Sequence, residues 1–130
     1  MWKPVSSVLL LVVAGCASVP SSTAPSAQQQ WSAYQSSIRQ QRDAGAMSAV
    51  RAEDAMRQKY RELFGPDPVM EGAFAYGRYL YASADAGGLP ISQADILAQA
   101  RVYEIEERRR ARASYNEWFE SRYPPLDVFE

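Results

Sequence analysis

The chain has 130 residues with 14 basic and 15 acidic side chains, so its net charge is only −1. This balance gives no strong attraction to nucleic acid or to anionic lipid. The single cysteine excludes an internal disulfide, and the absence of histidine removes the usual proton shuttle and the commonest metal ligand. The length suits one small domain with a modest core.

The first fifteen residues have the layout of a secretory signal. Lys3 places a positive charge before an apolar run over residues 5–13, and the small residues Ala14 and Gly15 follow. The apolar run is too short to span a bilayer as a permanent helix. We therefore predict that residues 1–15 are a signal peptide that directs export and is then removed.

The sequence Val13-Ala14-Gly15-Cys16 resembles the lipobox of bacterial lipoproteins. This resemblance implies cleavage before Cys16, transfer of a diacylglyceryl group and a further acyl chain such as palmitate to that residue, and a membrane anchor through the lipid. Ala17 follows the cysteine where aspartate would favour retention, so the resemblance implies the outer membrane. The sequence leaves open which face of that membrane carries the protein, and we favour the periplasmic face. The alternative is an ordinary signal peptide with an incidental cysteine.

The remaining chain divides into a tether, a domain and a tail. Residues 16–27 are predicted to form a flexible tether, because they are mostly alanine, serine, proline and threonine and carry no charge. Apolar side chains at helical spacing predict a helical domain over residues 28–123. Two consecutive prolines end the helical pattern, so residues 124–130 are predicted to be a C-terminal tail.

Four helices are predicted within the domain, over about 28–43, 47–64, 68–84 and 92–122. In the first helix, Trp31, Tyr34 and Ile38 share one side. Gly65 ends the second helix, because glycine tolerates the turn that closes it. Asp67 then caps the third helix, with a proline at its first position.

The third and fourth helices carry two more local signals. Gly77 lies in the middle of the third helix, where glycine costs about 1 kcal/mol relative to alanine, so we expect a close helix–helix approach there. Ser92 is predicted to cap the fourth helix, and the Asp95 side chain is predicted to accept a hydrogen bond from the backbone N–H of Ser92 in return. This helix is expected either to continue to Arg122 or to break near Arg112.

The turn Asp43-Ala44-Gly45 recurs as Asp85-Ala86-Gly87, which indicates an internal repeat of helix, turn and helix. We predict an all-α fold of two helical hairpins, stacked so that each covers the apolar face of the other. Chance similarity among alanine-rich helices is the alternative. With Ser92 and Asp95, the second turn resembles helical hairpins of the short C-terminal domain (SHOCT) type, apart from extra residues after the glycine. The chain also resembles small helical lipoproteins of Gram-negative bacteria, and neither resemblance implies an activity.

No motif points to catalysis, a metal or a cofactor. The sequence contains no glycine-rich phosphate loop, nucleophile elbow or metal-ligand spacing. Glutamates at 104, 106 and 107 precede arginines at 108–110, a pattern typical of a solvated, ion-paired helix surface. Glu71, with Tyr76 and Arg78, is the set that would line a cleft. An enzyme using carboxylates is therefore only a third hypothesis, and we predict that the protein is not an enzyme.

Aromatic side chains gather near the end of the fourth helix, where Tyr115, Trp118, Phe119 and Arg122 share one face. This face either binds a partner, as aromatic and arginine side chains often do, or folds back onto the first and third helices as core. We favour the core, because so small a domain needs its large apolar side chains. The predicted function is a lipid-anchored, non-catalytic interaction or assembly module with an envelope protein partner. The alternative is a cell-wall or glycan-binding lipoprotein that uses the aromatic face.

Overall fold

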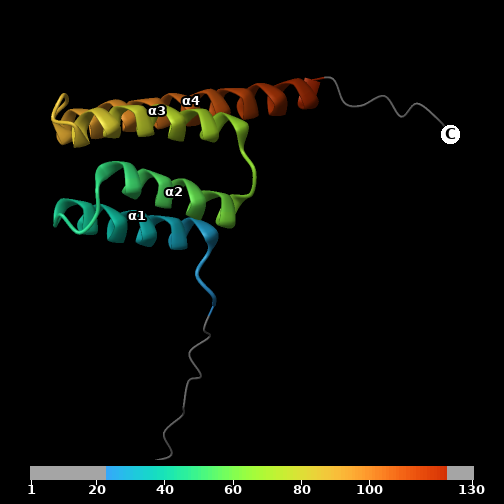
Figure 1. Cartoon of the computed structure of the whole chain (residues 1–130). Coiled ribbons are helices and arrows are strands. Elements are labelled where there is room, and N and C mark those ends of the chain that lie inside the picture. The colour runs from blue at the N-terminus through green and yellow to red at the C-terminus, as the bar shows by residue number, and fades with distance from the viewer. Residues whose placement is uncertain (1–22, 123–130) are drawn as a thin grey trace, which may run out of the picture.

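The computed structural model describes residues 23–122, which form four α-helices and no strand (Figure 1). The helices are α1 (Ala27–Asp43), α2 (Ala49–Phe64), α3 (Pro68–Asp85) and α4 (Ile91–Arg122). The predicted all-α class with four helices is confirmed, and α4 runs without the break considered near Arg112. The predicted signal peptide, Cys16, most of the tether and the tail lie outside the described residues.

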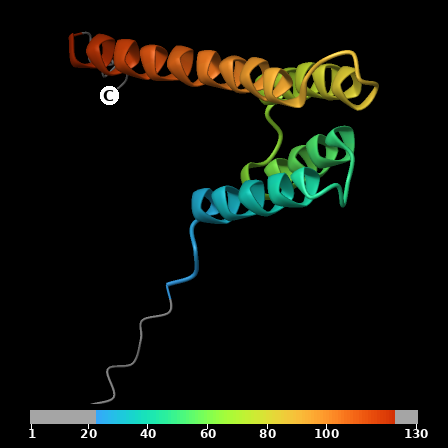
Figure 2. The same cartoon turned by 90° about the vertical axis from the view of Figure 1, so that its left-hand side faces the viewer.

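The helices form two hairpins, α1 with α2 and α3 with α4, and α2 packs on α3 to join them. Extensive packing connects only helices that are consecutive in the chain. Figures 1 and 2 show the two hairpins stacked, with the red end of α4 running past the other helices. At 1.5 Å per residue, the 32 residues of α4 extend about 48 Å, whereas the 18 residues of α3 extend about 27 Å.

Both hairpins close with the same turn. Gly45 has a φ of 75° and Gly87 a φ of 79°, so both occupy the left-handed region that glycine favours. The backbone N–H of the next residue, Ala46 or Gly88, donates to a helix carbonyl five residues earlier at 2.9 Å in each turn. This bond is the long hydrogen bond of a Schellman motif. The glycine role that the recurring Asp-Ala-Gly sequence predicts is therefore confirmed.

Replacing Gly87 with valine is expected to destabilise the domain by about 1 kcal/mol or more, because a β-branched residue is strained at positive φ. Thermal unfolding followed by circular dichroism should show a loss of about 4–8 °C per kcal/mol. Gly72→Ala is the matched control: an added Cβ at this helical position meets no atom within 4 Å. That control should stabilise by about 0.5–1 kcal/mol. Equal melting temperatures for the two variants would contradict the left-handed conformation assigned to Gly87.

The first three helices begin with capping side chains. Ser26 forms a capping box with Gln29 at the start of α1, and Ser48 accepts from a backbone N–H at the start of α2. Asp67 caps α3 by accepting from the backbone N–H of Met70 at 3.2 Å, and a proline follows it at the first helical position. The predicted cap and proline of the third helix are confirmed.

The start of α4 differs from the prediction. The helix begins at Ile91, so Ser92 lies inside it and is not its cap. The carbonyl oxygen of Pro90 accepts from the backbone N–H groups of Gln93 and Ala94 at 3.0 and 3.1 Å, which starts the helix earlier than expected. Asp95 consequently does not return a capping bond, and its carboxylate is available for contacts with other helices.

The start of α2 is completed by the other hairpin. The carboxylate of Asp85, at the end of α3, accepts from the backbone N–H of Ala49 at 2.9 Å and of Val50 at 3.0 Å. An acidic group at a helix N-terminus satisfies free N–H donors and interacts favourably with the helix dipole. Asp43, its counterpart in the repeat, pairs instead with the neighbouring Arg42 at 2.9 Å. The two turns thus have the same backbone conformation, but their aspartate side chains have different partners.

All four helices contribute to the core. Trp31 of α1, Tyr60 of α2 and Phe74 of α3 meet edge to face, with ring centroids 5.4–6.5 Å apart. Trp31 and Tyr60 pack against the cluster of buried residues to which Phe74 belongs: Ile38, Ala52, Met56, Met70, Ala73, Phe74 and Ile105. A second buried cluster, near the turns, consists of Ala49, Leu80, Tyr81 and Ala94. Each hairpin therefore covers apolar side chains of the other.

Gly77 brings α3 close to a side chain of α2. A Cβ added at Gly77 would collide with Oε1 of Glu53 and lie 3.0 Å from its Cδ. Only glycine leaves room for the buried Glu53 carboxylate in its present position. The sequence predicts a close helix–helix approach at this glycine, whereas the atoms that come close are those of a glutamate side chain.

Candidate functional site

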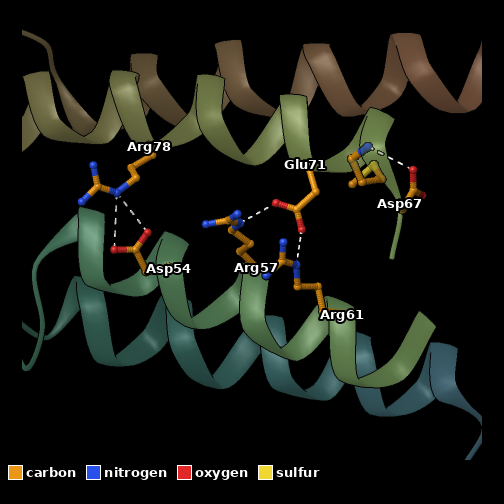
Figure 3. Close-up of polar contacts among 7 residues, drawn as sticks. Asp54, Arg57, Arg61, Asp67, Glu71 and Arg78 are labelled. Atoms are coloured by element: carbon orange, nitrogen blue, oxygen red, sulfur yellow. Dashed lines mark hydrogen bonds and ion pairs between the residues drawn. The ribbon is translucent and has the colours of Figure 1, made fainter. Parts of the chain in front are cut away.

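Ion pairs cover the exposed face where α2 and α3 meet (Figure 3). Nε of Arg57 donates to Oε2 of Glu71 at 2.6 Å, and Arg61 contacts the other oxygen of the same carboxylate. Arg78 pairs with Asp54 at 3.1 Å. Glu71 and Arg78 thus have separate partners, and the structure does not bring them together around a cleft as considered from the sequence.

The acidic and basic run in the middle of α4 is an ion-paired surface, as predicted. Glu104 pairs with Arg108 at 2.5 Å and with Arg101 at 3.0 Å. Arg110 pairs with Glu107 at 2.5 Å. Since these side chains are exposed, the pairs are expected to contribute little to stability.

A clamp joins the end of α1 to the beginning of α4. Arg42 donates from Nη1 and Nη2 to the two carboxylate oxygens of Asp95, at 2.7 and 2.9 Å, and the Tyr81 hydroxyl donates to Oδ1 at 2.8 Å. Burial would raise the pKa of Asp95, but these hydrogen bonds outweigh it and lower the pKa below its usual value. The sequence predicts only a local capping role for Asp95 and does not indicate this contact.

A second clamp of the same composition lies at the opposite end of the two hairpins. Nη2 of Arg109 donates to both carboxylate oxygens of Asp67 at 2.8 Å, and the Tyr60 hydroxyl donates to Oδ2 at 3.1 Å. Asp67 also caps α3, so its one carboxylate connects α2, α3 and α4. Nothing local in the sequence indicates this pairing, because Arg109 and Asp67 are far apart in the chain.

A cleft of about 210 Å³ lies between α1 and α4, with α2 and α3 as its floor. Its apolar lining includes Trp31, Met56, Met70, Phe74 and Val102. Its polar lining includes Arg39, Glu53 and Asp95. The space exists because α1 and α4, the two outer helices, have no extensive packing with each other. The cleft therefore brings apolar and charged groups of all four helices together.

Glu53 is the most unusual group in this cleft. It is only 7% exposed, and within residues 23–122 no hydrogen bond or ion pair joins its carboxylate to another side chain. Burial raises its pKa to about 7, the neighbouring Asp54 adds to the rise, and Arg39 and Arg42 oppose it. Glu53 is not among the site residues predicted from the sequence. The available signal was its spacing, four residues after Ala49 on the buried side of α2.

The predicted aromatic face is present on α4. The ring centroid of Tyr115 lies 5.9 Å from that of Trp118 and 6.2 Å from that of Phe119, and the guanidinium of Arg122 lies 5.7 Å from the Trp118 ring. We call these four residues the aromatic stripe. Tyr115 is 60% exposed, Trp118 49% and Phe119 45%.

The preference for this face as core was wrong. The aromatic stripe lies beyond Arg109, whose partner Asp67 precedes the first turn of α3. Because α4 continues as one helix past that point, its last turns run beyond the ends of α1 and α3 instead of folding back onto them (Figure 2). The four side chains share a face, as predicted, but outside the core.

Comparison with protein-family models, with curated proteins and with solved structures gave no match for this chain. None of α1 to α4 combines the length and hydropathy that a membrane-spanning helix requires. Among residues 23–122, no three potential metal ligands of the cysteine, aspartate and glutamate types group together.

Proposed function

We propose that this protein is a lipid-anchored lipoprotein of the bacterial envelope that acts as a non-catalytic interaction or assembly module and holds a protein partner with the aromatic stripe. The observation that carries the proposal is the exposure of Tyr115 and Trp118 on a helix that runs past the body of the domain. Exposed apolar patches of this kind mark interaction sites more often than isolated surface residues do.

The composition of the aromatic stripe suits protein recognition. Tryptophan, tyrosine and arginine are the residues that most often dominate binding energy at interfaces. Arg122 lies over the Trp118 ring, a cation–π contact that holds both side chains in place before a partner arrives. Because these side chains lie on a continuous helix, their backbone has little conformational freedom left to lose when a partner binds.

Photo-crosslinking in intact envelopes tests whether the aromatic stripe contacts a protein partner. A photoreactive phenylalanine derivative at position 118 is expected to crosslink to a protein of the envelope. The same derivative at Tyr79, which is 74% exposed on α3, is the matched control and should not give that product. Equal products at both positions would contradict the assignment of the aromatic stripe. Sedimentation with peptidoglycan that depends on Trp118, without a protein product, would favour the glycan-binding alternative.

The proposed anchor has its own test. Cys16→Ser is expected to abolish incorporation of a labelled fatty acid and to leave an uncleaved or soluble protein, because the hydroxyl of serine does not replace the thiol that accepts the lipid. Metabolic labelling of both forms measures this, and undiminished label in the variant would contradict the anchor. Fractionation of the unaltered protein is expected to place it in the outer membrane.

A further inference from the structure

We propose that the cleft between α1 and α4 binds a small ligand with an alkylammonium group on an apolar body, and that the ammonium group lies against the Glu53 carboxylate. This site is distinct from the aromatic stripe: it lies within the body of the domain, where all four helices line it. Its existence does not depend on the proposed function.

The apolar half of the site comes from all four helices. Trp31 lies on the α1 side, Met56 and Phe74 form part of the floor, and Val102 lies on the α4 side. Sites for small ligands are concave, mostly apolar and equipped with few polar groups that fix orientation. A ligand body of aromatic or aliphatic carbon would therefore be removed from water here, which favours binding.

The polar half of the site favours a cation. Arg42 and Asp95 neutralise each other, and Asp54 pairs with Arg78 on the far side of α2. Two other charged groups of the lining, Glu106 and Arg109, pair with Arg110 and Asp67. Glu53 and Arg39 have no ion pair among the described residues. Because Glu53 is buried and Arg39 is exposed, an ion at Glu53 is screened by water far less than an ion at Arg39. The charged and titratable groups that act on Glu53 come from all four helices: Arg39 and Arg42 of α1, the adjacent Asp54 of α2, Tyr81 of α3 and Asp95 of α4.

An ammonium group would give the Glu53 carboxylate the positively charged hydrogen-bond donor that no described side chain provides. The Glu53 carboxylate is largely, though not fully, removed from water and has no hydrogen-bonding partner among the described side chains, which is unfavourable. A cation that donates hydrogen bonds reduces that penalty. Gly77 leaves the carboxylate room beside α3, so Glu53 keeps its buried position at the cleft. The raised pKa of Glu53, about 7, agrees with a charge that lacks a partner in the free protein.

Methyl NMR of the full chain with ¹³C-labelled methionine tests the proposal, with 2-phenylethylamine as the probe. The methyl signals of Met56 and Met70, which line the cleft, are expected to shift, and that of Met47, which does not, should stay. The neutral analogue 2-phenylethanol should bind at least tenfold more weakly. Between pH 6 and pH 8 the amine should bind about tenfold more tightly, because Glu53 ionises over this range.

Two variants complete the test. Glu53→Gln is expected to weaken amine binding at least tenfold, whereas Asp54→Asn, the adjacent carboxylate on the far face, should bind nearly as the unaltered chain does. Should Glu53→Gln fail to fold, the amine and alcohol comparison on the unaltered chain still decides. Equal affinity for amine and alcohol, or full affinity in a folded Glu53→Gln, would overturn the proposal. If Nα-acetyl-lysine amide binds more tightly than 2-phenylethylamine, the ammonium group of the natural ligand belongs to a lysine side chain. If 2-phenylethylamine binds more tightly, the natural ligand is a free amine.

Discussion

Replacing Phe74 with alanine is expected to destabilise the domain by about 3–5 kcal/mol, because a large ring is removed where three helices meet. Phe74 is 7% exposed, and its ring centroid lies 5.6 Å from that of Tyr60 and 6.5 Å from that of Trp31. Domains of this size have a total stability of about 5–15 kcal/mol. Thermal and urea unfolding followed by circular dichroism should show an early transition or none.

Trp118→Ala is the matched control, since it removes an aromatic ring of the aromatic stripe. Its effect on stability is expected to stay within about 0.5 kcal/mol, as for surface substitutions elsewhere. Within residues 23–122, the aromatic and cation–π contacts of the ring are with Tyr115 and Arg122 of its own helix, and the side chain is half exposed. A melting temperature that falls as far as that of Phe74→Ala would show that the aromatic stripe supports the core, and the proposed docking surface would be wrong.

The second large effect is a loss of stability as the pH rises, caused by Glu53. The folded protein raises the pKa of this carboxyl from 4.5 to about 7, chiefly by burial. The folded state therefore binds the proton more tightly than the unfolded state. The stability that this group contributes is fully present below about pH 4.5 and is lost as the pH rises through 7. The total loss is about 3 kcal/mol, and urea unfolding at a series of pH values measures it.

Substitution of Glu53 isolates this effect. Glu53→Gln should remove the fall in stability between pH 4.5 and 8, whereas Asp54→Asn should keep most of it. Asp95 acts in the opposite direction, because its lowered pKa makes stability fall as the pH drops below the usual aspartate range. The two pH windows are separate, so one does not hide the other. A Glu53→Gln protein that keeps the full fall would show that another group causes it.

The parts of the fold that depend on neighbouring residues could be predicted from the sequence. Gly45 and Gly87 mark both turns because positive φ restricts the choice of residue at those positions. Asp67 followed by a proline marks the start of α3 for a similar reason. Helical spacing of apolar side chains located all four helices to within about two residues, which is the usual uncertainty of helix ends.

The parts that depend on distant residues could not be predicted. Asp95 has the local features of a capping residue, yet its partner is Arg42 on another helix, and only the folded chain brings them together. Glu53 lies on the buried side of α2, but its lack of a partner becomes visible only once α1 and α4 are in place. Trp118 was favoured as a core residue because a small domain needs large apolar side chains in its core. Its exposure depends instead on the length of α4.

The order in which the helices pack has a consequence for the speed of folding. Extensive contacts join only α1 with α2, α2 with α3, and α3 with α4, so few loops have to close before contacts form. Helical proteins with such local topology fold in microseconds to milliseconds. The Asp85 carboxylate that completes the start of α2 comes from the end of α3. The central pair of helices, which belongs to neither hairpin alone, is therefore expected to form early and to set the rate.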